Sequence, residues 1–205
     1  MADKKTVEAY NKIAEDYQAR NSVTMYDEEY RVYRSLTEGR GKVIEIGCGI
    51  GRDSEELIRM GFDYIGIDAS EEMLKIAREK VPEGNFVLGD FYKLDFPDGV
   101  FDGFWAAASF LHVPKSDIND VLLESKRVLR KGGIGFISIK EKTNIDEGFI
   151  KEDKAGGIER YFSFYSKEEF EDIIINNGFE VVQFMSRQEN DKDKTNWLCF
   201  FVKNL

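Results

Sequence analysis

From residue 42 onward, short apolar runs alternate with longer segments in which apolar residues recur every three or four positions. The short runs are typical of strands buried on both faces of a sheet, and they cover residues 42–46, 64–67, 85–88, 101–105 and 134–139. The longer segments are typical of amphipathic helices, and they cover residues 53–60, 71–80, 116–130 and 167–177. This alternation predicts an α/β fold built from βαβ units on a mostly parallel sheet.

The C-terminal part of the chain breaks this alternation. Residues 179–184 and 196–203 are two strand-like runs joined by the polar stretch 186–195, with no helix-like segment between them. Two strands connected in this way pair antiparallel, so we expect an antiparallel edge on the otherwise parallel sheet.

The first forty residues read as two helices, 6–20 and 27–36, and they carry several tyrosines. The tyrosines in and beside these helices are Tyr10, Tyr17, Tyr26, Tyr30 and Tyr33. A tyrosine has an apolar ring and a polar tip, which suits the wall of a half-wet cavity. Buried tyrosines are also common in ordinary cores, so both interpretations stay open for each ring.

Helix ends are marked by glycines and by one serine. Gly61, Gly132 and Gly178 each follow a predicted helix, where a residue in the left-handed conformation needs no Cβ. Ser70 precedes two glutamates, which predicts the N-cap of the helix that begins at residue 71.

Composition favours one folded domain and excludes some partners. The 205 residues are 42% hydrophobic, which is enough for one sizeable core. The net charge is -10 and no block of Lys or Arg stands apart from acidic residues, so we expect no nucleic-acid partner. Residues 1–20 lack the apolar region of a signal peptide, and residues 101–113 are too few to span a bilayer. We therefore expect a cytoplasmic protein without a membrane partner.

The two cysteines, Cys48 and Cys199, show no spacing typical of metal ligands. We expect neither a metal site nor a structural disulfide.

The main candidate site is the loop of residues 45–51, EIGCGIG, between the first strand and the next helix. Gly47, Gly49 and Gly51 allow a sharp turn and a close approach of the backbone to a ligand. Asp68 ends the second strand, at the edge where open α/β sheets bind ligands, and can accept hydrogen bonds from both ribose hydroxyls. An alternative role for Asp68 is to cap the helix that follows.

The loop differs from a dinucleotide-binding fingerprint at its sixth position. That fingerprint has a glycine where this chain has Arg52. Glu45 also places negative charge at the start of the loop, which disfavours a pyrophosphate and favours a cofactor with a cationic amino group. Asp90 and Phe91 follow the third strand and could meet an adenine amino group and ring face.

These motifs resemble the class I S-adenosylmethionine-dependent methyltransferases, in particular the branch that methylates small molecules. The resemblance rests on five segments in the expected order, namely residues 43–53, 66–70, 88–91, 101–114 and 129–133. It implies a Rossmann-like, doubly wound, seven-stranded sheet, mostly parallel with an antiparallel last strand, and an N-terminal helical cap. It implies S-adenosylmethionine as cofactor and S-adenosylhomocysteine as product.

Carried over by position, the resemblance assigns roles to individual residues. Asp68 would hold the ribose and Asp90 with Phe91 the adenine, while Gly47 and either Trp105 or Ala106 would offer carbonyls to the methionine amino group. Arg52 would contact the cofactor or brace the loop, and Tyr17 would close over it. The full set of expected cofactor-binding residues is Tyr17, Glu45, Gly47, Cys48, Gly49, Gly51, Arg52, Asp68, Ala69, Ser70, Met73, Asp90, Phe91, Trp105 and Ala106.

His112 is the only histidine and lies just past the fourth strand, so it is the candidate for a general base. The alternative is a structural histidine bonded to a loop carbonyl. A base is optional for methyl transfer, because positioning of the acceptor and removal of water supply much of the rate.

Residues 140–165 form a long connection, rich in charged and aromatic residues, of the kind that often forms a lid. The resemblance places Tyr10, Glu141, Arg160 and Tyr165 on the acceptor side. Arg160 could instead pair with Glu159 at the surface.

We expect residues 1–205 to form one methyltransferase domain. Within it, residues 1–40 would be a helical cap, 41–140 the cofactor-binding half, and 141–205 the acceptor-side segment with the C-terminal strands. Two alternatives remain: a cofactor-binding protein of this fold that regulates a partner without catalysis, and a nicotinamide-dependent oxidoreductase. The composition favours a small, partly apolar acceptor and gives no indication of oligomeric state.

Overall fold

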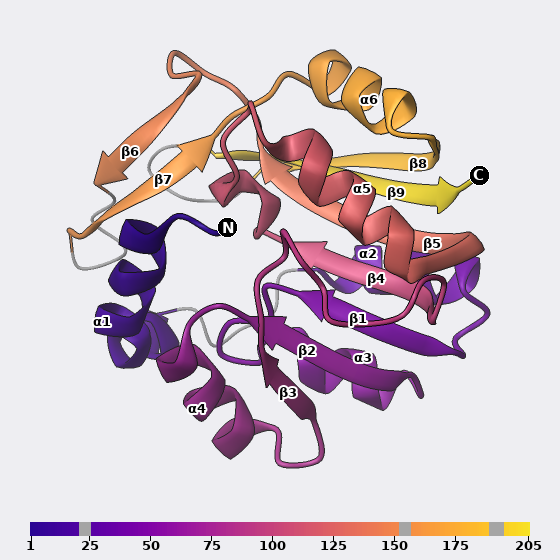
Figure 1. The fold of residues 1–205 in the computed structure, drawn as a ribbon, viewed down its shortest axis with the longest axis horizontal. Helices are drawn as coiled ribbons and strands as arrows, with labels where there is room; N and C mark the ends of the chain where they lie inside the picture. Colours follow the sequence, from indigo (N-terminus) through magenta and orange to yellow (C-terminus); the bar gives the residue numbers. More distant parts are fainter. Residues whose placement is uncertain (21–25, 152–156, 189–194) are drawn as a thin grey trace.

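The computed structural model describes residues 1–20, 26–151, 157–188 and 195–205. Its centre is a seven-stranded sheet in the order β3-β2-β1-β4-β5-β9-β8 (Figure 1). The strands of this sheet are β1 (Lys42–Ile46), β2 (Asp63–Asp68), β3 (Asn85–Leu88), β4 (Phe101–Ala107), β5 (Leu129–Lys140), β8 (Phe179–Gln188) and β9 (Asn196–Asn204). Strands β1 to β5 pair parallel, and β9 pairs antiparallel with both β5 and β8. The predicted mostly parallel sheet with an antiparallel last strand is confirmed.

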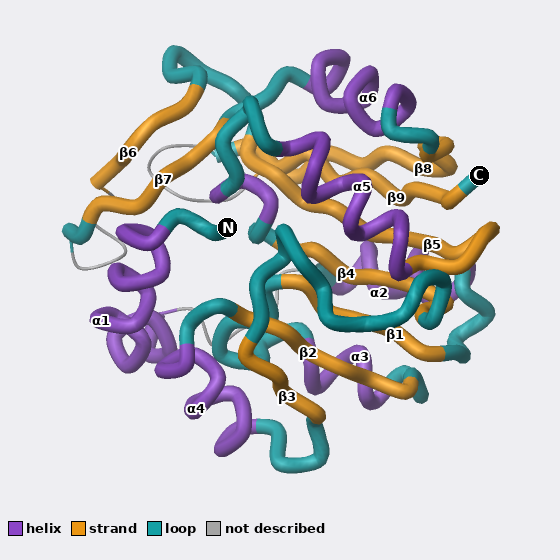
Figure 2. Tube along the Cα trace, in the orientation of Figure 1, coloured by secondary structure: helices purple, strands orange, loops and turns teal. Residues whose placement is uncertain are grey.

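Helices cover both faces of this sheet, with α5 and α6 in front and α2 and α3 behind in the view of Figure 2, while α4 lies beside β3. Helix α1 lies beside the carboxyl ends of the strands and packs against α4 and β7. The helices are α1 (Lys4–Arg20), α2 (Asp27–Leu36), α3 (Ser54–Arg59), α4 (Glu71–Lys80), α5 (Ile118–Val128) and α6 (Lys167–Asn176), with a short 3-10 helix η1 (Phe110–His112).

Helix α5 ends two residues before the predicted end at 130, because Leu129 already pairs with Phe101 in the sheet. Gly132 therefore does not end a helix. It lies inside β5 with φ 74, where the pairing with β4 is irregular before Gly103 and Ile134 come into register. Gly61 and Gly178, with φ 96 and 77, do follow helix ends as predicted.

The long connection at 140–165, predicted to be of the kind that often forms a lid, contains regular structure, and residues 152–156 within it lie outside the described part of the chain. It contains β6 (Glu147–Lys151) and β7 (Glu159–Ser163), which pair antiparallel as a separate two-stranded sheet. Strand β8 also continues four residues beyond the predicted end at 184, because its pairing with β9 reaches Gln188. Of the polar connection predicted at 186–195, residues 189–194 lie outside the described part of the chain.

The aromatic core separates the N-terminal tyrosines into two groups. Tyr26, Tyr30 and Tyr33 are buried against Trp105, with ring centroids 5.9, 4.9 and 5.2 Å from it. Trp105 itself stacks on Phe136 at 3.8 Å. These three tyrosines pack on the sheet, whereas Tyr10 and Tyr17 line a pocket at the carboxyl ends of the strands.

Candidate active site

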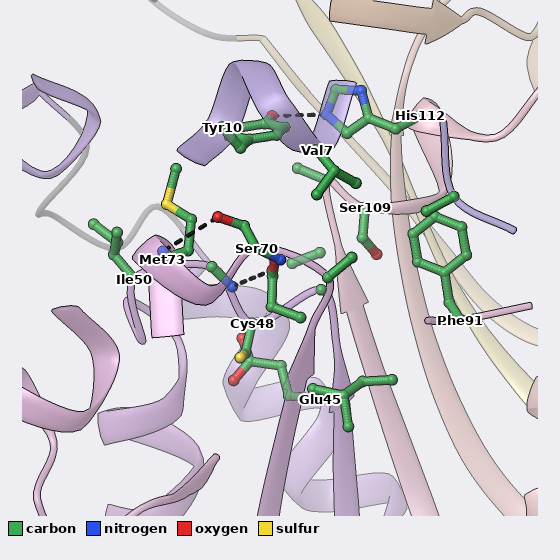
Figure 3. A pocket seen from close by; sticks show the side chains of 18 of the residues that line it. Val7, Tyr10, Glu45, Cys48, Ile50, Ser70, Met73, Phe91, Ser109 and His112 are labelled. Carbon is green, nitrogen blue, oxygen red and sulfur yellow. Dashed lines mark hydrogen bonds between the residues drawn. The ribbon is translucent and has the colours of Figure 1, made fainter. Parts of the chain in front are cut away.

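The pocket lies where β1, β2 and β4 end, and α1 covers it (Figure 3). The structure brings many of the predicted site residues together around it. Those that line it are Tyr10, Tyr17, Glu45, Gly47, Cys48, Gly49, Arg52, Asp68, Ala69, Ser70, Met73, Phe91 and His112.

The three glycines of the loop all have positive φ, and their surroundings differ. Gly47 has φ 79, and a Cβ at this residue would lie 2.5 Å from the Ser109 Cβ. Gly49 has φ 53 and faces open space in which a ligand could approach the backbone. Gly51 has φ 72, and a Cβ at this residue would lie 3.3 Å from the Ala77 Cα of α4; Gly51 does not line the pocket.

Asp68 joins the glycine loop to the start of α4. Its Oδ2 accepts from the Gly49 N–H at 2.8 Å, and its Oδ1 accepts from the Ser70 N–H at 2.8 Å. Burial raises the pKa of this carboxyl, while the backbone N–H groups act in the opposite direction. The helix itself is capped by Ser70, whose Oγ accepts from the Met73 N–H at 3.2 Å. Asp68 is thus not the N-cap of this helix; it lines the pocket and has acceptor capacity beyond its two backbone bonds.

A buried polar cluster lies below the loop. Glu45 accepts hydrogen bonds from Ser54 Oγ at 2.7 Å and from the Tyr64 hydroxyl. Burial raises the pKa of Glu45, and the negative charge of Asp53 raises it further. The Asp53 carboxylate accepts from Arg52 Nε at 2.9 Å and Nη2 at 3.0 Å. Burial alone would raise the pKa of Asp53, but the Arg52 charge and its hydrogen bonds hold it below the ordinary value.

Trp105 belongs to this cluster and does not line the pocket. Its Nε1 donates to Asp53 Oδ2 at 3.4 Å, and the Tyr30 hydroxyl donates to Asp53 Oδ1 at 2.8 Å. Neither Trp105 nor Ala106 lines the pocket, whereas Ala107 at the end of β4 and the following Ala108 and Ser109 do. A contact of the Trp105 or Ala106 carbonyl with the cofactor stays a prediction.

Asp90 lies beside the pocket without lining it. Its Oδ2 accepts from the Ala2 N–H at 2.8 Å and its Oδ1 from the Tyr92 N–H at 3.0 Å. The neighbours Gly89 and Phe91 do line the pocket. A contact between Asp90 and an adenine stays a prediction.

His112 takes part in a hydrogen-bonded series that crosses from η1 to α1 and β7. Its Nδ1 lies 2.6 Å from the Tyr161 carbonyl oxygen, which can only accept, so Nδ1 carries the proton. Its Nε2 then accepts from the Tyr10 hydroxyl at 2.7 Å, and that hydroxyl accepts from Arg160 Nη1 at 2.7 Å.

Burial lowers the pKa of His112 to about 3, and the charges of Arg160 and Lys140 act in the same direction. The imidazole is therefore neutral near pH 7, and its lone pair is already used by Tyr10. The sequence suggested a structural bond to a loop carbonyl as an alternative; the carbonyl that His112 bonds belongs to Tyr161 in strand β7, and a role as base stays a prediction.

The other expected acceptor-side residues do not line the pocket. Arg160 is buried and meets it through Tyr10, with the guanidinium 4.9 Å from the ring centroid. Glu159 pairs with Lys5 at 2.7 Å. Glu141 accepts from Asn196 Nδ2 at 2.7 Å, and Tyr165 packs on Phe170. Direct contact of these residues with an acceptor stays a prediction.

Two comparisons with known proteins bear on this geometry. Residues 44–137 match the protein family described as methyltransferase domain. Methyltransferase GfsG of Streptomyces halstedii is 37% identical over 111 residues, which are 50% of this chain and 39% of that protein. Demethylmenaquinone methyltransferase of Thermotoga maritima is 29% identical over 63% of this chain and 59% of that protein. The chain carries a class I S-adenosylmethionine-dependent methyltransferase domain.

A solved structure agrees with this domain in fold. The 1,6-didemethyltoxoflavin-N1-methyltransferase of Burkholderia thailandensis superposes with a TM-score of 0.73 at 17% identity, over 97% of this chain and 84% of that one. That structure holds S-adenosylhomocysteine. The predicted family, fold and cofactor are confirmed. The chain spans only 39% and 59% of the two curated relatives named above.

Sequence reasoning missed several residues that line the pocket of this methyltransferase domain. They are Ala2, Asp3, Thr6, Val7, Ile50, Asp53, Ile67, Gly89, Ala107, Ala108 and Ser109. Ala107, Ala108 and Ser109 are the three residues that follow the predicted Ala106, so a slightly longer predicted segment would have included them. The α1 residues had no local signal, because their place depends on docking: Thr6 Oγ1 accepts from the Tyr161 N–H at 2.9 Å.

Two features are absent from the described residues, 1–20, 26–151, 157–188 and 195–205. No helix among them is long and apolar enough to cross a membrane. The same residues contain no group of three or more His, Cys, Asp or Glu that could hold a metal ion.

Proposed function

We propose that this chain transfers the methyl group of S-adenosylmethionine to a small-molecule acceptor. The observation that carries the proposal is one pocket that joins the glycine loop, the Asp68 carboxylate and the covering helix α1 at the carboxyl edge of the sheet. Ligands of open α/β sheets bind at this edge.

The residues present fit the cofactor. The open space at Gly49 admits a ligand close to the backbone, and Asp68 has acceptor capacity left for ribose hydroxyls beyond its two backbone bonds. Met73, Ile50 and Phe91 supply apolar surface for an adenine ring. Asp90 would bind the adenine amino group from the edge of the pocket, and Tyr17 would cover the cofactor from α1.

When bound, the cofactor supplies an electrophilic methyl group on a sulfonium. The residues of the chain then bind and orient the two substrates and exclude water from the pocket. Helix α1 places Val7 and Tyr10 over the pocket, so it encloses an acceptor and removes water from the reacting atoms. His112 is neutral, and its lone pair accepts a hydrogen bond from Tyr10. This arrangement favours a reaction in which the acceptor is positioned for transfer and His112 does not remove its proton.

Two observations support a small acceptor. Residues of α1 and η1 line the pocket together with residues at the strand ends, which favours a site that encloses a small ligand. Two similar proteins carry the names of small acceptors, demethylmenaquinone and 1,6-didemethyltoxoflavin. The excess of acidic residues disfavours nucleic acid.

Calorimetric titration with S-adenosylhomocysteine tests the cofactor, and we expect a saturable, one-site isotherm. A panel of small acceptors incubated with S-adenosylmethionine then tests transfer by release of S-adenosylhomocysteine. Tight binding of NADH without binding of S-adenosylhomocysteine would overturn the proposal. Cofactor binding without transfer to any acceptor, and transfer only in the presence of a protein partner, would favour the regulatory alternative.

A further inference from the structure

The turn after β4 holds a serine hydroxyl that the proposed function has not used. Ser109 lines the pocket and is 5% exposed. Its Oγ is buried and has no hydrogen-bond partner among the described residues. Figure 3 shows this hydroxyl directed into the pocket. A buried hydroxyl without a hydrogen-bond partner destabilises the free protein. A ligand group that forms a hydrogen bond with this hydroxyl therefore gains binding free energy.

The backbone beside Ser109 is strained in a way that fixes this side chain. Ala108 has φ 55, which a residue with a Cβ rarely adopts. The Ala108 N–H donates to the Ser138 carbonyl and Oγ, each at 3.1 Å, and Ser138 Oγ bonds the Tyr26 hydroxyl at 2.8 Å. The surrounding structure thus holds the turn in place, as is typical of strain at ligand sites.

The same turn brings Ser109 against the glycine loop. A Cβ on Gly47 would lie 2.5 Å from the Ser109 Cβ and 3.3 Å from its Oγ. Gly47 therefore leaves the room that Ser109 occupies, and the hydroxyl lies beside the first glycine of the loop.

The strand order shows which part of the cofactor reaches this place. Strand β2, which carries Asp68, lies between β3 on one side and β1 with β4 on the other. The apolar lining residue Phe91 follows β3, whereas the charged Arg52 and Asp53 follow β1. With the ribose at Asp68, the apolar adenine lies toward β3 and the charged amino-acid end toward β1 and β4.

We propose that Ser109 Oγ accepts a hydrogen bond from the α-ammonium of the amino-acid end of the cofactor. This inference rests on the proposed function, because it takes the ribose to lie at Asp68. Ser109 is then a binding residue for the amino-acid end of the ligand, whereas Asp68 binds the nucleoside.

The test compares two ligands in the full chain. S-adenosylhomocysteine carries the amino-acid end, and 5′-methylthioadenosine carries the same adenine, ribose and sulfur without it. For Ser109→Ala we expect the affinity for S-adenosylhomocysteine to fall roughly tenfold to a hundredfold, since a hydrogen bond to a charged group is lost. The affinity for 5′-methylthioadenosine should stay the same. Calorimetry measures both.

Thermal unfolding without ligand adds an independent readout. The variant loses a hydroxyl that has no partner among the described residues, so its melting temperature should not fall. Ser125→Ala is the matched control, because it removes another buried hydroxyl, one that donates to the Val121 carbonyl at 2.8 Å within α5 and outside the pocket. This control should bind both ligands like the natural chain.

Three results would overturn the inference. They are equal weakening of both ligands by Ser109→Ala, no weakening of either, and a fall in melting temperature without ligand. If the natural chain binds neither ligand, the proposed function fails instead, so the two failures are distinguishable.

Discussion

The two sides of the pocket are built by interactions of different range. On the side predicted to hold the cofactor, Asp68 accepts from the N–H groups of Gly49 and Ser70, which are 19 and 2 residues away in sequence. On the side predicted to hold the acceptor, the Tyr10 hydroxyl bonds His112 and Arg160, which are 102 and 150 residues away.

This difference shows how the molecule divides its tasks. Bonds from the Gly49 and Ser70 N–H groups to the Asp68 carboxylate join the glycine loop to the end of β2 and the start of α4. The acceptor side forms only when α1, η1 and β7 meet. We therefore expect changes on the cofactor side to affect ligand affinity most, and changes on the acceptor side to affect the docking of α1.

The largest effect should come from Asp68→Ala. It removes the expected ribose acceptor, so the affinity for S-adenosylhomocysteine should fall by about a hundredfold or more. It also leaves two backbone N–H groups without their acceptor, so the free energy of unfolding should fall by about 1–3 kcal/mol. Calorimetry and urea unfolding measure the two effects. Asp98→Ala, which changes an exposed carboxylate far from the pocket, is the control, and an unchanged affinity for Asp68→Ala would contradict the assignment.

A pair of glycine variants separates the roles within the loop. Gly47→Ala combines a positive φ with overlap against Ser109, and we expect it to lower the free energy of unfolding by about 3 kcal/mol. Gly49→Ala meets only the cost of φ 53, about 1 kcal/mol, because its Cβ would enter open space. That Cβ would instead stand where the ligand approaches. Equal losses of stability in urea would show that the contact with Ser109 is unimportant.

The contrast in range also explains what the sequence could predict. The strands β1 to β4, the glycine loop and the N-cap at Ser70 depend on neighbouring residues, and the structure has them within two residues of where the pattern placed them. The place of Arg160 depends instead on its contact with Tyr10 of α1, 150 residues away in sequence. A pattern that is read locally gives no signal for such contacts.

The residues at the end of β4 were predicted from the sequence only in part. The sequence located the turn, but the side chain of Trp105 is drawn into the core by Phe136 and Asp53. Periodicity alone does not say where a strand stops alternating, so the residues that line the pocket, Ala107 to Ser109, were missed by a few positions. The expected roles of Asp90, Glu141 and Tyr165 stay predictions.

Tyr10→Phe tests the acceptor side. It keeps the ring and removes the hydroxyl that joins His112 to Arg160, so we expect a loss of about 1–3 kcal/mol in the free energy of unfolding. Amide hydrogen exchange in α1 should become faster, while S-adenosylhomocysteine should lose far less affinity than with Asp68→Ala. Tyr92→Phe is the control, since its hydroxyl donates to Asp117 outside the pocket. Unchanged exchange in α1 would mean that other contacts dock this helix.

The smallest effect concerns Glu45, whose pKa is raised first by burial and then by the charge of Asp53. A carboxyl with a raised pKa binds its proton more tightly in the folded chain than in the unfolded one. Its contribution to stability is therefore present at low pH and is lost as pH rises through the raised pKa.

Glu45→Gln removes this titration, so the free energy of unfolding of the natural chain should fall more steeply than that of the variant between about pH 5 and pH 8. Urea unfolding at several pH values measures the difference in slope. The cationic end of the cofactor would favour the ionised carboxylate, so binding of S-adenosylhomocysteine should release protons in the natural chain and fewer in the variant. Parallel slopes would show that Glu45 is ionised in the folded chain, and the polar cluster below the loop would then carry two negative charges against Arg52.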